Sequence, residues 1–439
     1  MMQLPSFPEH VNFQITDHKW IGNVPSHWEL RANKYIFSLK KQAVGKRSAE
    51  YDLLSLTLRG IIKRDMENPE GKFPAEFDTY QEVSPGDFVF CHFDVEETPR
   101  TVGLSDFHGM ITGAYTVYRT QKSVDPRFLL YFYLNADSNK KLRSLYTGLR
   151  NTISKDAFAS FKTPMPPLPE QHAIAAFLDD KCAKIDEAVK IKEDQIALLR
   201  ERRQIIIQDA VTRGLNPAAP MKDSGIDWIG QIPAHWDLQP MRAFFRFRNE
   251  KNDPIKTENI LSLSIAHGVT AYSEEGRGGN KRKDDLTAYK LAYPGDIVLN
   301  SMNVIVGAVG RSKYFGAISP VYYAFYPVGN HVYVPFYEQI FLNAGFQRGL
   351  LRHGKGILIK LSGTGQLNTI RMKISTDDLK GLLFPTPPQS EQRLIVEYIS
   401  DQSLKINNGI AIKERQISAL KEYKTSLINA AVTGKIKVV

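Results

Sequence analysis

The sequence predicts an α+β protein in which two similar mixed α/β domains alternate with two long helices that pack on each other. Three observations carry this prediction. An eleven-residue stretch with two tryptophans occurs twice, as WIGNVPSHWEL at 20–30 and as WIGQIPAHWDL at 228–238. Two proline-free runs, 170–213 and 391–434, have the length and pattern of long helices. Short apolar, β-branched and aromatic runs, which predict strands, precede each of these helices.

The repeat extends well beyond the tryptophan motif. SPGDFVF (84–90) matches YPGDIVL (293–299) at a displacement of 209 residues, and PEQ (169–171) matches SEQ (390–392) at a displacement of 221. Since the matches occur in the same order in both halves, gene duplication explains them. The growing displacement predicts an insertion of about a dozen residues in the second copy, between residue 325 and Asn368.

The two long runs share one apolar pattern, which superposes at the displacement of 221 residues. Its steps of three, four and seven residues are those of a heptad seam with two positions skipped, and basic residues occupy the skipped positions in both copies. Two helices packed on each other explain this pattern, because a polar seam residue fixes register and long basic stems can reach solvent. Two unrelated amphipathic surface helices are the alternative. The predicted seam comprises Ile185, Val189, Lys192, Ile196, Leu199, Arg203, Ile206 and Ala210, and Ile406, Ile410, Lys413, Ile417, Leu420, Lys424, Leu427 and Ala431.

The globular parts contain further predicted elements. Pro-Gly-Asp at 85–87 and at 294–296 predicts a turn that leads into a strand. Strands are predicted at 87–93, 115–120, 296–302 and 321–328, and shorter helices at 128–146 and 336–351.

Composition narrows the function classes. Lys and Arg number 57 against 47 Asp and Glu, so the chain carries a formal charge of +10, which favours a polyanionic partner such as nucleic acid over a merely solvated basic surface. No apolar run is long enough to span a bilayer, and the first residues lack the pattern of a signal peptide. The only cysteines, Cys91 and Cys182, cannot form a disulfide framework, so a cytoplasmic protein with reduced thiols is expected.

A search for catalytic motifs finds none that holds. The sequence has no phosphate-binding G-x-x-x-x-G-K-[ST] motif, and its ten histidines and two cysteines lack metal-ligand spacing. His27 and His235 recur within the tryptophan motif without a partner at ligand spacing, and a structural role is predicted for both. Neither a catalytic residue nor a cofactor or metal site is therefore predicted.

Several stretches, all but one of them repeated, are together characteristic of one protein family. They are WIG-x-(V/I)-P-x-HW, Pro-Gly-Asp, the helix starts PPLPEQ and PPQSEQ, the helix ends AVTRG (210–214) and AVTGKI (431–436), and MKDSGIDWIG (221–230). With them the chain resembles the specificity subunits of type I DNA restriction–modification systems over nearly its whole length. The first copy departs from the pattern, because it has FQITDHKWIG in place of the MKDSG lead.

The resemblance implies two DNA target-recognition domains and two helices packed as an antiparallel coiled coil, with an internal pseudo-two-fold repeat. The expected domains are residues 1–165 and 216–384, with spacer helices at 166–215 and 385–439. The partners implied are double-stranded DNA and two methyltransferase subunits, with restriction (translocase or nuclease) subunits as a further candidate. S-adenosylmethionine would be bound by the methyltransferase and not by this chain.

The expected function is that of a non-catalytic reader of a bipartite DNA site, in which the helices set the gap between the half-sites. A fused restriction or modification enzyme with its own activity is the alternative, and a coiled-coil adaptor that binds no DNA is a third. The basic loop GRGGNKRK (276–283) suits groove entry, although a solvated loop explains it nearly as well. Tyr272 suits stacking on a base or simple packing. The candidate DNA-binding residues are Arg59, Lys63, Arg64, Arg100, Tyr272, Arg277, Asn280, Lys281, Arg282, Lys283, Arg311 and Lys313.

Overall fold

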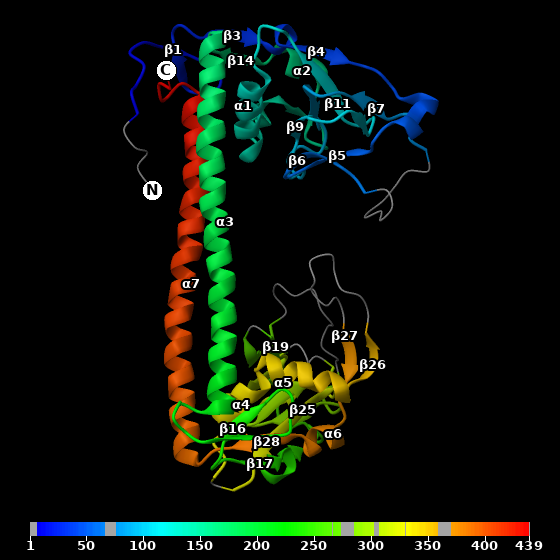
Figure 1. Cartoon of the computed structure of the whole chain (residues 1–439). Helices are drawn as coiled ribbons and strands as arrows, with labels where there is room; N and C mark the ends of the chain where they lie inside the picture. The colour runs from blue at the N-terminus through cyan, green and yellow to red at the C-terminus, as the bar shows by residue number, and fades with distance from the viewer. Residues whose placement is uncertain are drawn as a thin grey trace. The chain divides into compact units, whose positions relative to one another are not determined.

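The computed structural model describes residues 7–65, 76–265, 267–273, 285–302, 307–329, 331–358 and 370–438. The chain forms two compact units (Figure 1). The first unit comprises Met1–Glu193 and Glu414–Val439, and the second comprises Asp194–Lys413. Each unit therefore holds one globular part together with a segment of both long helices.

The first unit is built on a four-stranded antiparallel sheet with the strand order β4-β11-β8-β9. Strand β8, in its middle, is buried along its entire length, which explains its run of apolar residues. Helix α1 (Pro126–Ser138) contacts β9, and its N-terminus is capped by Asp125, whose side chain accepts a hydrogen bond from the Phe128 N–H. The strands of the sheet are β4 (Phe37–Lys40), β8 (Asp87–Phe90), β9 (Val102–Leu104) and β11 (Thr116–Thr120).

Antiparallel strand pairs and short helices surround this sheet. The pairs are β1 (Phe13–Ile15) with β2 (Asn23–Pro25), β3 (Glu29–Ala32) with β14 (Lys162–Met165), β5 (Leu54–Thr57) with β6 (Gly60–Lys63), β7 (Gln81–Val83) with β10 (Gly109–Ile111), and β12 (Tyr146–Thr147) with β13 (Thr152–Ile153). The short helices are η1 (Asn33–Tyr35), η2 (Gly45–Glu50), η3 (Arg143–Leu145) and α2 (Lys155–Ser160).

The second unit repeats the strand topology of the first. Its sheet has the corresponding order β18-β25-β22-β23, formed by β18 (Phe245–Arg248), β22 (Ile297–Asn300), β23 (Val309–Arg311) and β25 (Tyr322–Pro327). Its strand pairs are β15 (Met221–Asp223) with β16 (Gln231–Pro233), β17 (Asp237–Pro240) with β28 (Leu383–Thr386), β19 (Leu261–Ser264) with β20 (Gly268–Ala271), β21 (Lys290–Ala292) with β24 (Gly316–Ile318), and β26 (Lys355–Leu358) with β27 (Ile370–Lys373). Its shorter helices are η4 (Met241–Ala243), α4 (Val334–Phe341), α5 (Ala344–Gly349), η6 (Leu350–His353) and α6 (Thr376–Gly381). The predicted duplication is thus a duplication of the fold.

The long helices are α3 (Leu168–Arg213, 46 residues) and α7 (Gln389–Val432, 44 residues). In the first unit Asp186 pairs with Lys424 and Glu193 with Lys421, so the residue number rises along one helix as it falls along the other. In the second unit Arg203 donates a hydrogen bond to Asn407, while Leu199 lies against Gly409. The helix segments are therefore antiparallel within each unit, and the predicted α+β fold with an antiparallel helix pair is confirmed.

None of the predicted seam residues is fully exposed to solvent. Ile185, Val189, Ile196, Ile406 and Leu427 are buried, and the other apolar members and the four basic ones are half-buried or buried. Three of the basic residues reach the opposite helix: Lys192 donates to Gln416 at 3.0 Å, Arg203 to Asn407 at 3.0 Å, and Lys424 to Asp186 at 2.6 Å. A basic stem in the seam is thus satisfied by a polar partner across it.

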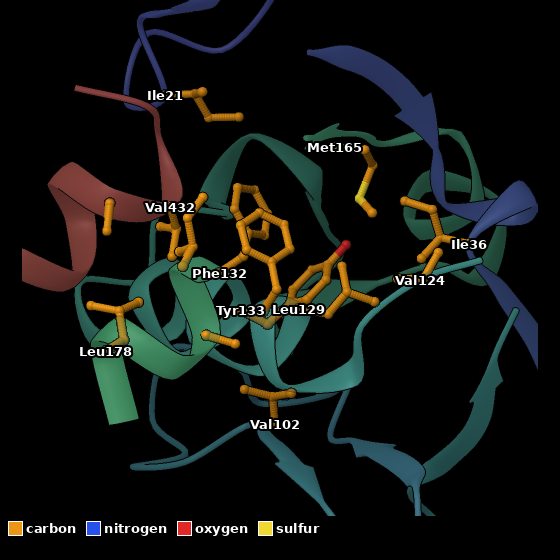
Figure 2. Close-up of a cluster of buried hydrophobic side chains, with 14 of the residues drawn as sticks. Ile21, Ile36, Val102, Val124, Leu129, Phe132, Tyr133, Met165, Leu178 and Val432 are labelled. Atoms are coloured by element: carbon orange, nitrogen blue, oxygen red, sulfur yellow. The ribbon is translucent and has the colours of Figure 1, made fainter. Parts of the chain in front are cut away.

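The helices also complete the hydrophobic core of the first unit. Figure 2 shows Phe132 and Tyr133 of α1 at the centre of this core, with Leu178 of α3 and Val432 of α7 beside them. All four side chains are at most 1% exposed. Because the globular part and both helices share one core, they form a single packed unit.

Two predicted helices are shorter than expected. The helix predicted at 128–146 ends at Ser138, because the chain turns at Lys140, which has a φ of +48°. The helix predicted at 336–351 breaks after Phe341, where the Asn343 side chain accepts the Phe346 N–H and starts a new helix. Local capping residues override the continuous apolar pattern at both places. No helix in the described part of the chain is long and apolar enough to cross a membrane.

His92 is expected to make the stability of the first unit depend on pH. Its ring is stacked on Phe90, with centroids 5.4 Å apart, and burial lowers the pKa of His92 from 6.5 to about 4. The unfolded chain binds this proton below pH 6.5 and the folded unit does not, so stability should fall by about 3 kcal/mol between pH 6.5 and 4. We expect His92→Phe to remove that loss, measured as urea unfolding of the first unit at several pH values. An unchanged pH profile would show that His92 does not cause it.

Candidate functional site

The repeated tryptophan motif holds the start of a long helix in each unit. The Trp28 indole N–H donates to Glu170 Oε1 at 3.0 Å, and His27 Nε2 lies 2.8 Å from Glu170 Oε2. In the second unit Trp236 donates to Glu391 at 2.9 Å, and His235 lies 2.7 Å from the same carboxylate. Each glutamate lies in the first turn of its helix, where the helix dipole favours negative charge. The repeated His-Trp pair is therefore a clamp on a helix N-terminus.

The glutamine that follows each of these glutamates forms a second bond to the globular part. The side-chain carbonyl of Gln171 accepts the Asp125 N–H at the start of α1, and that of Gln392 accepts the Tyr333 N–H before α4. Both glutamine side chains are buried and donate to a proline carbonyl just before their own helix. This is the physical reason for the repeated Glu-Gln, whose role the sequence alone does not reveal.

The far end of the other long helix meets the same motif. Gly434, after α7, has a φ of +68°, and a Cβ there would lie 2.2 Å from Pro25 and 3.3 Å from Trp28. Gly214, after α3, has a φ of +70°, and its Cβ would lie 3.1 Å from Trp236. Glycine is required at both helix ends because of the backbone angle and the close approach. Each tryptophan motif therefore contacts the start of one long helix and the end of the other.

The Pro-Gly-Asp turns serve a structural purpose. Asp87 is fully buried and accepts a hydrogen bond from the Ser84 N–H at 2.9 Å. Its carboxylate also pairs with Lys40, at the end of β4, at 2.9 Å. Asp296 accepts the Tyr293 N–H at 2.9 Å and two hydrogen bonds from Arg248, at 2.6 and 3.0 Å. Hydrogen bonding to the Asp296 carboxylate raises the pKa of Arg248. These aspartates close the turn and balance a cation, which leaves them no part in surface chemistry.

The structure gathers the candidate DNA-binding residues of the first unit around one hairpin, β5–β6. Arg59 is exposed in its turn, and Lys63 lies at its end, 2.5 Å from Asp52. Arg64 follows, with its backbone N–H bonded to the Leu53 carbonyl. Arg100 comes from a distant loop but donates to the Leu58 carbonyl at 3.4 Å. Three residues of one stretch and Arg100 of another therefore share one surface region, although Lys63 and Arg100 already have carboxylate partners.

In the second unit the candidates are more dispersed. Tyr272 is partly buried and packs beside Ile260 and Tyr289. Arg311, at the end of β23, lies 3.5 Å from Glu338, and Lys313 is exposed nearby in sequence. The hairpin β19–β20 corresponds to β5–β6 and passes close to β23, since a Cβ on Gly310 would lie 2.9 Å from Gly268. The loop candidates Arg277, Asn280, Lys281, Arg282 and Lys283 lie outside the described residues.

One cluster in the described part of the chain has the composition of a metal site. His10, His27 and Glu170 each offer a ligand atom, and these atoms lie within 4.8 Å of one another. Burial lowers the pKa of His10, which favours the neutral imidazole that a metal would bind. No local pattern marks His10 as a possible metal ligand, because it stands 17 residues before His27 and is absent from the second copy.

Comparison with known proteins agrees with this geometry. A sequence model described as the type I restriction modification DNA specificity domain matches residues 107–197. The StySPI type I restriction enzyme specificity subunit of Salmonella potsdam is 31% identical over 339 residues, which cover 73% of this chain and 68% of the relative. This chain belongs to the type I restriction enzyme specificity subunits. The putative MjaX specificity subunit of Methanocaldococcus jannaschii is 22% identical and aligns over the full length of both chains.

Solved structures share the fold of this specificity subunit. One chain, from a structural study of complex assembly and conformational transition of the type I R-M system, has a TM-score of 0.64 at 13% identity and covers 93% of this chain and 98% of its own length. The HsdS subunit from Thermoanaerobacter tengcongensis has a TM-score of 0.51 at 14% identity, with coverage of 94% and 98%. The specificity subunit recognises DNA sequence for a restriction–modification system.

Proposed function

We propose that this specificity subunit reads a DNA site in two parts, one part per unit, and performs no catalysis itself. The observation that carries the proposal is the duplicated fold, in which the helix clamp is the same in both units while the β5–β6 and β19–β20 hairpins differ locally. Their first strands are nearly identical, LSLT and LSLS, but their turns and their second strands, GIIK and GVTA, differ. Equivalent frames with hairpins that differ in their turns and second strands suit two recognition surfaces of different specificity. A fused enzyme is the weaker alternative, because the His-Trp and Pro-Gly-Asp groups are engaged in structural bonds.

The hairpin β5–β6 is the proposed reading surface of the first unit. It offers Arg59 at its exposed turn, with Arg64 and Arg100 close by, and arginine both reads guanine edges and binds phosphates. By correspondence, the second unit would read DNA with β19–β20 and the basic loop that follows it in the chain. The overall charge of +10 supports contact with a polyanion.

Methyltransferase subunits, two per chain, and restriction subunits are the proposed protein partners. The helix segments of the second unit support docking, because Leu198 is 63% and Ile205 is 53% exposed, seven residues apart on α3. S-adenosylmethionine would then be bound by the methyltransferase. Both cysteines are buried and unpaired, which fits a reducing cytoplasm. Methyl transfer by the isolated chain would overturn the non-catalytic proposal.

Arg59→Ala tests the reading surface. We expect it to weaken binding to the cognate site by about 1–3 kcal/mol and, if Arg59 reads a base, to relax one position of one half-site only. The measurement is DNA binding at several salt concentrations, combined with methylome sequencing of cells that carry the variant. Arg127→Ala is the matched control, because it removes an equal charge from α1, where Arg127 pairs with Asp179. Equal effects of both variants would remove Arg59 from the reading surface.

A further inference from the structure

Three side chains from separate segments converge at the first turn of α3. His10 comes from the segment before β1, His27 from the tryptophan motif, and Glu170 from the helix itself. His27 Nε2 lies 2.8 Å from Glu170 Oε2, and His10 Nε2 lies 3.8 Å from Glu170 Oε1. Two imidazoles and a carboxylate thus face one point.

The environment of His10 is unusual for a polar side chain. Its side chain is only 8% exposed, and its buried Nε2 has no hydrogen-bond partner among the described residues. A buried polar atom without a partner costs free energy, and such atoms are uncommon in folded proteins. A ligand at the centre of the cluster would satisfy this nitrogen.

We propose that His10, His27 and Glu170 bind a divalent transition-metal ion of the zinc type. Two histidines and one carboxylate form a ligand set that zinc accepts, with a water completing the tetrahedron. Ligand atoms around such an ion are separated by about 3.3 Å, given metal–ligand bonds of about 2 Å. The present separations, from 2.8 Å to at most 4.8 Å, lie on either side of this value, so small side-chain rotations suffice.

The surroundings suit such an ion. The His27 side chain is 49% exposed, so water can reach the fourth position. The Trp28 indole N–H donates to Glu170 Oε1 and orients the carboxylate, in the way that neighbours of metal ligands commonly do. The ion would also fasten the segment around His10, where Pro8 accepts the Lys437 N–H and Phe7 packs edge-on against Phe177 of α3.

The second unit provides an internal control. It repeats the His235–Glu391 contact and the Trp236 bond, but Ala218 stands where the first unit has His10. Backbone bonds fix this correspondence, because Ser26 donates to the Asn12 carbonyl and Ala234 to the Pro220 carbonyl, each 208 residues further on. The second unit should therefore bind no zinc at this position.

The test uses the full-length chain without a histidine tag, freed of metal by a chelator and titrated with Zn²⁺ by calorimetry at pH 7.5. We expect one equivalent to bind in the wild type and in His235→Ala, and binding to weaken at least tenfold in His10→Ala. His10 makes no hydrogen bond through Nε2, so the variant should fold, and His10→Gln gives a second variant that keeps a polar side chain. Ala218→His is expected to add a second equivalent.

Two results would overturn the proposal. The first is that no stoichiometric Zn²⁺ binds to the wild-type chain. The second is that His10→Ala and His10→Gln bind Zn²⁺ as tightly as the wild type, which would assign the binding to other histidines. Thermal unfolding of the first unit provides an independent readout, because only a chain with the site intact should unfold at a higher temperature when Zn²⁺ is added.

Discussion

Trp236→Ala is expected to lower the free energy of unfolding of the second unit by about 3–5 kcal/mol, the range for removing a fully buried large aromatic side chain. Trp236 is 0% exposed, lies against Gly214 and donates its indole N–H to Glu391. Its loss therefore opens a cavity and also leaves the carboxylate at the start of α7 with one bond fewer. Hydrogen exchange resolved by peptide, during denaturant unfolding, would measure the loss in each unit separately.

Trp28→Ala is the matched variant, because Trp28 makes the same contacts in the first unit. It should lower the free energy of unfolding of the first unit by a similar amount. Trp236→Phe keeps most of the apolar volume and loses the N–H, so about 1–2 kcal/mol is expected. If Trp236→Ala destabilised both units equally, or by less than Trp236→Phe, the clamp would not have the role described.

A paired heptad deletion is expected to change the DNA site that is recognised. Removing Lys192–Leu198 from α3 and Ile410–Gln416 from α7 shortens both helices by seven residues while keeping the facing residues in step, because Lys192 faces Gln416 and Leu199 faces Gly409. Seven helical residues span about 10 Å, which corresponds to about three base pairs of DNA. Methylome sequencing should show the original site lost and any new site with a gap shorter by about three base pairs.

A paired insertion of one heptad is the complementary variant and should lengthen the gap by the same amount. Replacing the seven residues of each segment with a different heptad of equal length serves as the control, and the gap should stay unchanged. An unaltered gap after the paired deletion would refute the proposal that helix length sets it.

The architecture could be predicted from the sequence because the duplication repeats each sequence pattern in both halves of the chain. The seam from Ile185 to Ile206 is persuasive because its counterpart from Ile406 to Leu427 breaks at the same basic positions. The proline-free runs 170–213 and 391–434 match the two helices to within two residues at each end, since proline precedes each helix and glycine follows it. Errors arose where capping acts locally, as at Asn343, because an apolar pattern continues across a break that a single side chain causes.

The contacts that define the sites could not be predicted in the same way. Glu170 and Trp28 are 142 residues apart, and only folding shows that one carboxylate serves both His27 and Trp28. Arg100 joins the β5–β6 hairpin through a contact that no local pattern encodes. The metal cluster depends on His10, which has no repeat to mark it. The DNA-contacting residues remain predictions, because exposure and charge say where a cation lies but not what it touches.

The division of the chain has a consequence for how new specificities can arise. The second unit is one uninterrupted stretch, Asp194–Lys413, while the first is assembled from two stretches on either side of it. A single exchange of genetic material, with crossovers inside the two helix-coding regions, would replace the second unit completely. Both crossovers would fall within repeated heptads, where a foreign helix segment can continue the seam in register. Recombination would thus change the half-site that the second unit recognises and leave the other half-site unchanged.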